Sequence, residues 1–431
     1  MNARATGFTI LLLSGLFSSL IFNSAAAQSR GENLDEAKVG SYTLPDPLKA
    51  ANGKSITSAQ EWTQMQRPAL LQLFQEHVYG KLPGKPKGLQ FKVSSVDKEA
   101  LGGKAIRKQI TVFFTQAADT PSMEVLLYLP KGTKGPVPVF AGLNFYGNHT
   151  VNPDPGIMLS TRWQRNTTDK KVVNNRATEA SRGMSSKSWE IEELISAGYG
   201  VATAYYGDLE PDHNEGWKTG IRTTLKSELG IKEDEWGAIG AWAWGLSRML
   251  DYLETDQDVN AKQVAIMGHS RLGKAALWAA ANDTRFALVI SNNSGEGGAA
   301  LARRNFGETI AIINKSFPYW FIPKYKEYSS QADKLPVDQH MLLALMAPHP
   351  LYVASAQDDA WADPKGEFLS AKNAEPVYTL FGKKGLGVTE MPPVNQPVGN
   401  TIRYHIRTGV HGITLYDWQQ YIAFADQQFK K

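Results

Sequence analysis

Ser270 is the residue whose surroundings point most directly to chemistry. An apolar strand pattern ends two residues before it at Gly268, and a helical pattern begins directly after it. Such a junction is typical of a nucleophile elbow, which exposes a serine hydroxyl in front of a helix N-terminus. The usual pattern also has glycine two places after the serine, where this chain has Leu272, with Gly273 one place late. A helix N-cap serine is the alternative interpretation of the motif taken alone.

A serine nucleophile needs a general base and a carboxylate that orients the base, and both are expected later in the chain. Asp358 and Asp359 follow an apolar strand pattern at 351–355, and His411 lies in a glycine-flanked loop before the last helical pattern. We therefore expect His411 to be the general base, and Asp358 or Asp359 to be the acid.

The other histidines fit structural roles better. His269 is expected to point to the opposite side of the elbow, His405 lies within a strand pattern, and His149 is interpreted as a loop residue. His340 and His349 flank an apolar helical pattern and are assigned to packing or capping. The sequence has no His-x-x-x-His pair and no dense carboxylate group, so it predicts neither a metal nor another cofactor.

The elements that must position these residues alternate between strands and helices. Strands are predicted at 108–114, 123–129, 137–143, 200–205, 264–268, 288–291, 351–355 and 402–406. Helices are predicted at 61–78, 236–253, 271–281 and 418–429. This alternation predicts an α/β fold with a mostly parallel sheet covered on both faces, after a first pair of hairpin type. Two polar insertions, 152–187 and 208–235, are too long for tight connections and are expected to shape a site.

The composition is that of a folded globular protein. Of 431 residues, 42% are hydrophobic and 20% charged, the net charge is only +4, and there is no cysteine. Disulfides and cysteine chemistry are therefore excluded, and no basic run supports nucleic-acid binding. The sequence is silent on the oligomeric state, for which a monomer is favoured.

The N-terminus predicts export. A basic start with Arg4 is followed by an apolar stretch at 8–22 and by small residues that end at Ala27. This pattern is typical of a signal peptide, predicted at 1–27, and the stretch is short for a membrane anchor. The remainder, 28–431, is predicted to be a single catalytic domain, periplasmic or secreted, with no membrane association after cleavage.

At these residues the chain resembles the glucuronoyl esterases, carbohydrate esterase family 15. The family motif Gly-x-Ser-Arg-x-Gly-Lys is matched throughout by residues 268–274, which also accounts for Leu272. The segments 143–149, 317–321, 335–340 and 359–364 are similar to the bacterial branch, and the resemblance extends from about Tyr79 to the C-terminus. It implies an α/β-hydrolase fold, a three-layer sandwich with a mostly parallel central sheet.

One departure from the fungal members concerns the acid. They carry a glutamate on the strand after the elbow helix, where this chain has Asn293. Because asparagine cannot stabilise an imidazolium by charge, the resemblance implies that the acid comes from the later strand end, as in many bacterial members. Asp359 is the preferred acid there, and Asp358 is the close alternative. Glu296 is a weaker third candidate.

The resemblance implies a substrate and further site residues. The substrate would be an ester of 4-O-methyl-glucuronic acid, the side group of xylan, with a lignin-type alcohol. Arg271 would contribute its guanidinium to the oxyanion site, beside its own backbone N–H. Lys274 and Glu308 would bind sugar hydroxyls, and Trp361 would pack on the sugar ring. A surface salt bridge and a core aromatic are the simpler interpretations of Glu308 and Trp361.

Two other functions remain open from the sequence. One is another carbohydrate esterase on the same fold, an acetyl-xylan or feruloyl esterase, because a fold does not determine a substrate. Arg271 and Lys274 favour the glucuronate reading, since an acetyl group offers that lysine nothing to hold. The other is a non-catalytic carbohydrate-binding protein, against which the set of Ser270, Asp359 and His411 speaks.

Overall fold

The computed structural model describes residues 1, 31–116 and 121–430. The signal peptide predicted at 1–27 lies, except for Met1, outside these residues. Glu32–Lys431 form one compact unit. No helix in the described part of the chain is long and apolar enough to cross a membrane.

The described residues contain twelve strands, and ten of these strands form one sheet. The strands are β1 Gln90–Glu99, β2 Ala105–Phe113, β3 Ser122–Pro130, β4 Val137–Asn144, β7 Gly200–Tyr205, β8 Val259–His269, β9 Leu288–Asn292, β10 Leu351–Ala356, β11 Val398–Gly399 and β12 Ile402–Arg407, with a separate hairpin of β5 Val172–Val173 and β6 Arg176–Ala177. Their order in the sheet is β1-β2-β3-β7-β4-β8-β9-β10-β12-β11.

The middle of the sheet is parallel and its two edges are antiparallel. The strands β7, β4, β8, β9, β10 and β12 run parallel, whereas β1 to β3 at one edge and β11 at the other pair antiparallel. His269 at the end of β8 pairs with Asn292 of β9, which in turn pairs with Ala354 of β10. The residues that follow these three strands therefore meet at one edge of the sheet, where α/β proteins place their sites.

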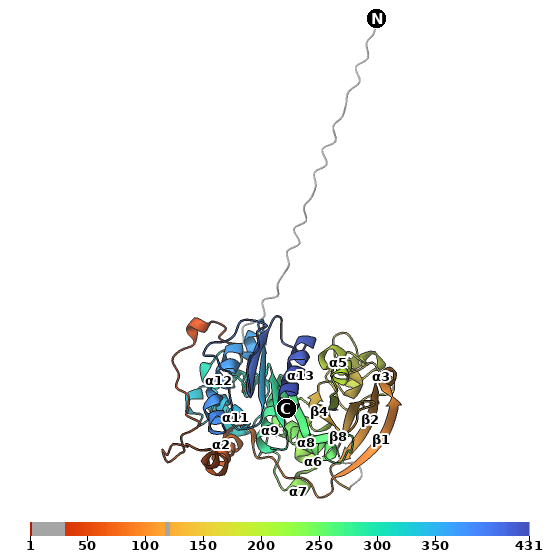
Figure 1. Ribbon diagram of the computed structural model, residues 1–431, viewed down its shortest axis with the longest axis horizontal. Coiled ribbons are helices and arrows are strands. Elements are labelled where there is room, and N and C mark those ends of the chain that lie inside the picture. Colours follow the sequence, from red (N-terminus) through yellow and green to blue (C-terminus); the bar gives the residue numbers. More distant parts are fainter. Residues whose placement is uncertain (2–30, 117–120, 431) are drawn as a thin grey trace. The chain divides into compact units, whose positions relative to one another are not determined.

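Helices cover both faces of this sheet. One face packs against α8 (Ala238–Leu253), α9 (Arg271–Asn282), α11 (Gln339–Ala344) and α12 (Pro364–Leu380), and the other against α5 (Ile191–Ser196) and α13 (Leu415–Phe429). Figure 1 shows α11 and α12 together at one side of this unit and β1 and β2 at the opposite side. The three layers are those of an α/β-hydrolase, which confirms the predicted fold class.

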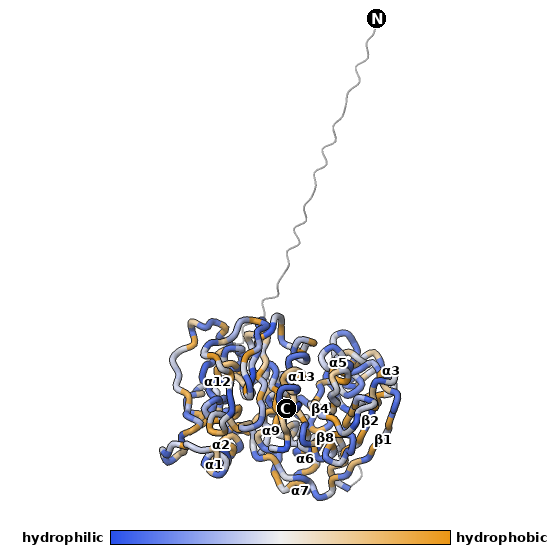
Figure 2. The backbone as a smooth tube through the Cα atoms, in the orientation of Figure 1, coloured by the Kyte–Doolittle hydropathy of each residue, from blue (hydrophilic) through white to orange (hydrophobic). Residues whose placement is uncertain are grey.

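The central strands are buried on both faces because successive side chains point in opposite directions. In β8, Val264 and Ile266 belong to the larger apolar core, while Ala265 and Met267 belong to the core on the other face. The edge strand β1 is mostly exposed, and Figure 2 shows hydrophilic segments along it. The parallel strands therefore form the rigid part that carries the site.

Shorter helices complete the unit. They are α1 Ala59–Glu61, α2 Arg67–Phe74, α3 Ala100–Gly103, α4 Ser186–Trp189, α6 Ile221–Thr224, α7 Lys226–Leu229 and α10 Ile310–Ser316. The helical path from α1 through α2 to Tyr79 is continuous and includes two π-helical turns. Of the two polar insertions, the first holds the hairpin β5–β6 and the second holds α6 and α7.

Candidate active site

Ser270 occupies the sharp turn between β8 and α9. The strand ends at His269 and the helix begins at Arg271, so the serine is the single residue between them. Its backbone has φ 56° and ψ −131°, a conformation that side-chain-bearing residues rarely adopt and that is typical of functional sites. A Cβ at Gly268 would lie 2.0 Å from the carbonyl oxygen of Leu272, which explains the glycine there. This is the geometry of a nucleophile elbow.

His411 is paired with a buried carboxylate. Its Nδ1 lies 2.6 Å from Oδ2 of Asp359, which is 5% exposed and follows β10. The Asn293 side chain donates to the same oxygen at 2.7 Å. Burial raises the pKa of Asp359, but the hydrogen bond and charge of His411 outweigh it, so that pKa lies below its usual value. The neighbouring Asp358 is exposed.

His269 lies against His411 and not on the opposite side of the elbow, so that expectation is wrong. The two ring centroids are 4.4 Å apart. Nδ1 of His269 is 2.7 Å from Oδ1 of Asn292, and burial lowers the pKa of His269 to about 3, so its ring is uncharged at neutral pH. This contact brings His411 to the elbow, although no hydrogen bond joins it to Ser270 among the described side chains.

The loop that carries His411 is held by Arg407. Its guanidinium donates to the carbonyl oxygens of Val410 at 3.0 Å and Gly412 at 2.7 Å, on either side of the histidine. Nε of Arg407 also donates to Asp417 at 2.7 Å, and neither of these two charged side chains is more than 3% exposed. The position of the histidine is therefore set by a buried ion pair between β12 and α13.

The Arg271 side chain is fixed beside the elbow. It pairs with Asp212, and its guanidinium carbon lies 4.8 Å from the ring centroid of Trp320. Cation–π distances of this size are attractive. Asp212 and Trp320 were not predicted as site residues. The signals that could have found them are the long insertion at 208–235 and the aromatic segment at 317–321.

Lys274, Glu308 and Trp361 form a second group on the same edge. Nζ of Lys274 donates to the Ser294 carbonyl at 2.6 Å and lies 3.7 Å from the Glu308 carboxylate. The Trp361 side chain also hydrogen-bonds to Glu308. Burial lowers the pKa of Lys274, and the negative charge of Glu308 partly offsets this. Burial raises the pKa of Glu308, and the positive charge of Lys274 partly offsets that. The ring centroid of Trp320 lies 5.8 Å from Nζ of Lys274, so this ring is close to both Arg271 and Lys274.

Glu296 does not contact His411. Its Oε1 accepts hydrogen bonds from Tyr325 at 2.5 Å and from the backbone of Gly297 at 3.0 Å. Burial raises the pKa of Glu296 to about 8, which keeps the carboxyl largely neutral at pH 7. Of the three candidate acids, Asp359 is the one that contacts His411. No group of three or more possible metal ligands occurs in the described residues.

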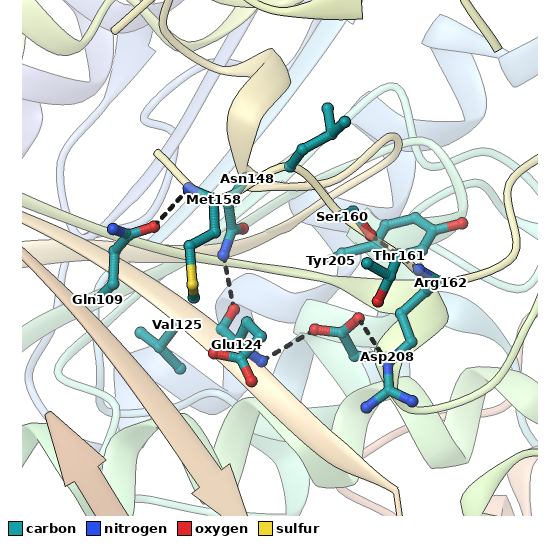
Figure 3. Close-up of a pocket in the computed structure, with 11 residues that line it drawn as sticks. Gln109, Glu124, Val125, Asn148, Met158, Ser160, Thr161, Arg162, Tyr205 and Asp208 are labelled. Atoms are coloured by element: carbon teal, nitrogen blue, oxygen red, sulfur yellow. Dashed lines mark hydrogen bonds and ion pairs between the residues drawn. The ribbon is translucent and has the colours of Figure 1, made fainter. Parts of the chain in front are cut away.

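A separate cavity of about 330 Å³ is lined by residues of β2, β3 and the segment 158–162 (Figure 3). Figure 3 shows the Asp208 carboxylate between Arg162 and the backbone N–H of Glu124, to which it bonds at 2.9 Å. The lining of the cavity also includes Tyr205 at the end of β7, but not Ser270, His411 or Lys274. The cavity therefore borders the segment that leads to Asp212 without containing the candidate nucleophile.

Known proteins are similar to this chain over nearly its whole length. Residues 226–382 match the family described as fungal glucuronyl esterase. A curated relative named carbohydrate esterase MZ0003, from an unknown prokaryotic organism, is 50% identical over 402 residues, which cover 93% of each chain. The solved glucuronoyl esterase from Solibacter usitatus is 51% identical with a TM-score of 0.86, covering 91% of this chain and 100% of that one.

A second solved structure has the same degree of likeness. It is a promiscuous esterase of carbohydrate esterase family 15 from a marine bacterial metagenome, 50% identical with a TM-score of 0.87, covering 93% of this chain and 100% of that one. Sequence identity this high over nearly the whole chain indicates membership of the same family and not only a shared fold. The protein therefore belongs to carbohydrate esterase family 15, the glucuronoyl esterases, and is an ester hydrolase.

Proposed function

We propose that the protein cleaves esters between the 4-O-methyl-glucuronic acid side groups of xylan and lignin-type alcohols, with Ser270 as nucleophile. The observation that carries the catalytic part is the 2.6 Å pairing of His411 with buried Asp359 beside the elbow. The glucuronate part is supported by the name of the similar protein from Solibacter usitatus, a glucuronoyl esterase.

The first half of the reaction forms an acyl-enzyme. Because Nδ1 of His411 is engaged by Asp359, Nε2 is available to take the proton of the Ser270 hydroxyl. The serine oxygen then bonds to the ester carbonyl carbon and a tetrahedral intermediate forms. As this collapses, the bond to the alcohol oxygen breaks and the alcohol leaves with the proton from His411.

The second half releases the acid. A water molecule gives one proton to His411 and attacks the acyl carbon, and the bond to Ser270 breaks as the proton returns to the serine oxygen. The uronic acid leaves and the free enzyme is restored. Every proton therefore passes through one histidine, and Asp359 stabilises the charged form of that ring throughout.

The negative oxygen of both tetrahedral intermediates needs donors that are already in place. The backbone N–H of Arg271 is one such donor, because it is the first amide after the nucleophile. We assign the Arg271 guanidinium as the second, since it is held beside the elbow by Asp212 and Trp320. A cationic donor forms a stronger hydrogen bond to an anion than a neutral amide does.

Lys274, Glu308 and Trp361 are proposed to bind the sugar. A buried ammonium paired with a carboxylate offers donors and acceptors to hydroxyl groups, while Trp361 is partly exposed next to Glu308. No such group is needed for an acetyl ester. This cluster therefore favours a uronic acid over a smaller acyl group.

Hydrolysis of benzyl glucuronate, compared with an acetyl ester and a feruloyl ester, tests this proposal, with Ser270→Ala as the control. We expect a clear preference for the glucuronate and no turnover by the variant. Preference for acetate or ferulate would keep the nucleophile and reject the substrate, an outcome made worth testing by the promiscuous relative. Sugar binding without turnover of any ester would favour the carbohydrate-binding protein.

We also propose that the protein is exported and cleaved after Ala27. The support is the basic start, apolar stretch and small residues of the N-terminal sequence. Expression of the full chain in a bacterium followed by N-terminal sequencing of the periplasmic protein tests it. A first residue of Gln28 is expected, and a full-length chain retained in the membrane would contradict it.

A further inference from the structure

Asp212 is the one hydrogen-bond partner of the Arg271 side chain within the described residues. Asp212 accepts a hydrogen bond from Nη1 of Arg271, whereas Nε of Arg271 is buried and has no hydrogen-bond partner in the described residues. The Arg271 side chain is 24% exposed, so it still reaches the surface of the site. One nitrogen of the cation is therefore committed to Asp212, and no other side chain or backbone group in the described residues accepts a hydrogen bond from the guanidinium.

Three neutral groups hold the Asp212 carboxylate in place. Tyr319 donates at 2.6 Å and Trp320 at 2.9 Å to one oxygen, and Tyr206 donates at 3.0 Å to the other. Burial raises the pKa of Asp212. The charge of Arg271 and the hydrogen bonds from Tyr319 and Trp320 outweigh this effect and hold that pKa below its usual value. The carboxylate is thus ionised, and part of its charge is taken up by groups other than Arg271.

Trp320 contacts both members of the pair. Its indole N–H bonds to Asp212, and the face of its ring lies under the Arg271 guanidinium. Phe317 stacks face to face on Trp320, with ring centroids 3.7 Å apart and an interplanar angle of 2°. The guanidinium is therefore held from one edge by a charge and from one face by an aromatic ring.

We propose that Asp212 is a positioning residue for the reaction, acting through Arg271. It holds the guanidinium in the orientation that serves the oxyanion, so that the long side chain does not have to be ordered during each turnover. Preorganised donors stabilise a developing charge far better than mobile ones do. This inference rests on the proposed role of Arg271. The competing explanation is a buried ion pair that only stabilises the fold.

A double-mutant cycle of Asp212→Asn and Arg271→Met separates these explanations, because it measures whether one residue acts through the other. We expect Asp212→Asn alone to lower kcat by about 100-fold, the effect of losing one oxyanion donor, with KM changed by less than about threefold. In the Arg271→Met background the same substitution should change kcat by less than about threefold. Equal losses in both backgrounds would overturn the proposal, as would an unchanged kcat.

A matched control is Asp251→Asn. Asp251 is also a buried carboxylate paired with arginines, Arg248 at 2.6 Å and Arg285 at 2.8 Å, but it lies on α8 outside the site. This variant should lower the melting temperature and leave kcat unchanged. A loss of kcat equal to that of Asp212→Asn would show that any broken buried ion pair slows the enzyme, and would overturn the positioning role.

Tyr319→Phe is a second variant in case Asp212→Asn does not fold. It removes one donor to Asp212 and keeps both charges. A loss of kcat of about 5- to 10-fold that disappears in the Arg271→Met background is expected, and a loss that persists there would overturn the proposal.

The cycle requires only an ester that the wild-type protein cleaves, benzyl glucuronate or an acetyl ester. A wrong substrate assignment therefore does not affect its outcome. An unchanged kcat for Arg271→Met would reject the proposed oxyanion role, and the positioning role with it. Loss of activity in Arg271→Met but not in Asp212→Asn would reject the positioning role alone.

Discussion

Asp358 and Asp359 are adjacent and chemically identical, and a matched pair of variants separates them. Asp359→Asn should lower kcat by about 1,000- to 10,000-fold, because an amide cannot stabilise the imidazolium and can reverse the tautomer of His411. Asp358→Asn should have little effect, since that side chain is exposed. Steady-state hydrolysis by both variants is the measurement, and equal losses would reject Asp359 as the sole acid.

Lys274 provides a residue-scale test of the acyl group. Lys274→Met removes the buried ammonium that lies 3.7 Å from Glu308 and keeps most of the side-chain volume. We expect KM for benzyl glucuronate to rise by about 10- to 100-fold with little change in kcat, as for the loss of one charge-assisted hydrogen bond in substrate binding.

An acetyl ester serves as the internal control for this variant, because it has no hydroxyl for the lysine to bind. Its kcat/KM should stay near the wild-type value. A parallel loss on both esters would show that Lys274 maintains the site and does not recognise the sugar.

At the scale of elements, the ion pair between β12 and α13 determines where His411 lies. Arg407→Leu leaves the buried Asp417 without its cation and frees the carbonyl oxygens on both sides of His411. Breaking a buried pair in this way costs about 3–5 kcal/mol in the free energy of unfolding. We expect a loss of that size in a denaturant titration, together with a lower kcat.

Arg403→Leu is the control on the same strand. Arg403 is only partly buried, and it donates a hydrogen bond of 3.2 Å to the neutral side chain of Gln427. A small change in stability and an unchanged kcat are expected. If both arginine variants lost the same stability, the contribution of Arg407 would come from the packing of the strand and not from the clamp on the loop.

For the whole molecule, buried neutral carboxyls make stability depend on pH. Glu367 joins the ends of two strands, β9 and β10: it accepts hydrogen bonds from the backbone of Ser294 at 2.7 Å and Gly295 at 3.0 Å, and contacts the Ser355 hydroxyl at 2.6 Å. Burial raises the pKa of Glu367 to about 8 from its ordinary value of 4.5. The proton is thus retained in the folded state and lost from the unfolded chain between these values.

Because the folded state binds the extra proton, this group contributes stability below about pH 4.5 that is lost as the pH rises through about 8. Glu367→Gln keeps the shape and a neutral charge at every pH. We therefore expect the melting temperature of the variant, relative to the wild type, to increase from pH 5 to pH 8 and then to level off. A constant difference across this range would contradict the raised pKa.

The parallel part of the sheet was predictable because its strands carry continuous apolar runs. The strand predicted at 200–205 coincides with β7, and the pair at 108–114 and 123–129 is the antiparallel pair β2–β3. The helix predicted at 271–281 is α9 apart from one residue. Such elements are buried on one or both faces, so the positions that face the core must be apolar. This requirement gives the sequence a recognisable pattern of apolar residues.

Among the elements that were not predicted, β1 and α12 illustrate two different physical reasons. The strand β1 lies at the edge of the sheet, and its side chains are mostly exposed, so its sequence lacks a buried face. The helix α12 begins with Pro364 and contains Pro376, which removes a backbone donor and weakens the helical signal. Both elements are stabilised by neighbours distant in the sequence.

The sequence by itself determined the local features of this protein. The elbow at Ser270 is made by consecutive residues, and the alternation of strands and helices follows from burial, so both appear in a linear pattern. Only the tertiary structure decided that Asp359 and not Asp358 faces His411, that His269 lies against that ring, and that Asp212 holds Arg271. These contacts join side chains from separate strands and loops. Their distances depend on how the sheet brings its strand ends together, which no local pattern encodes.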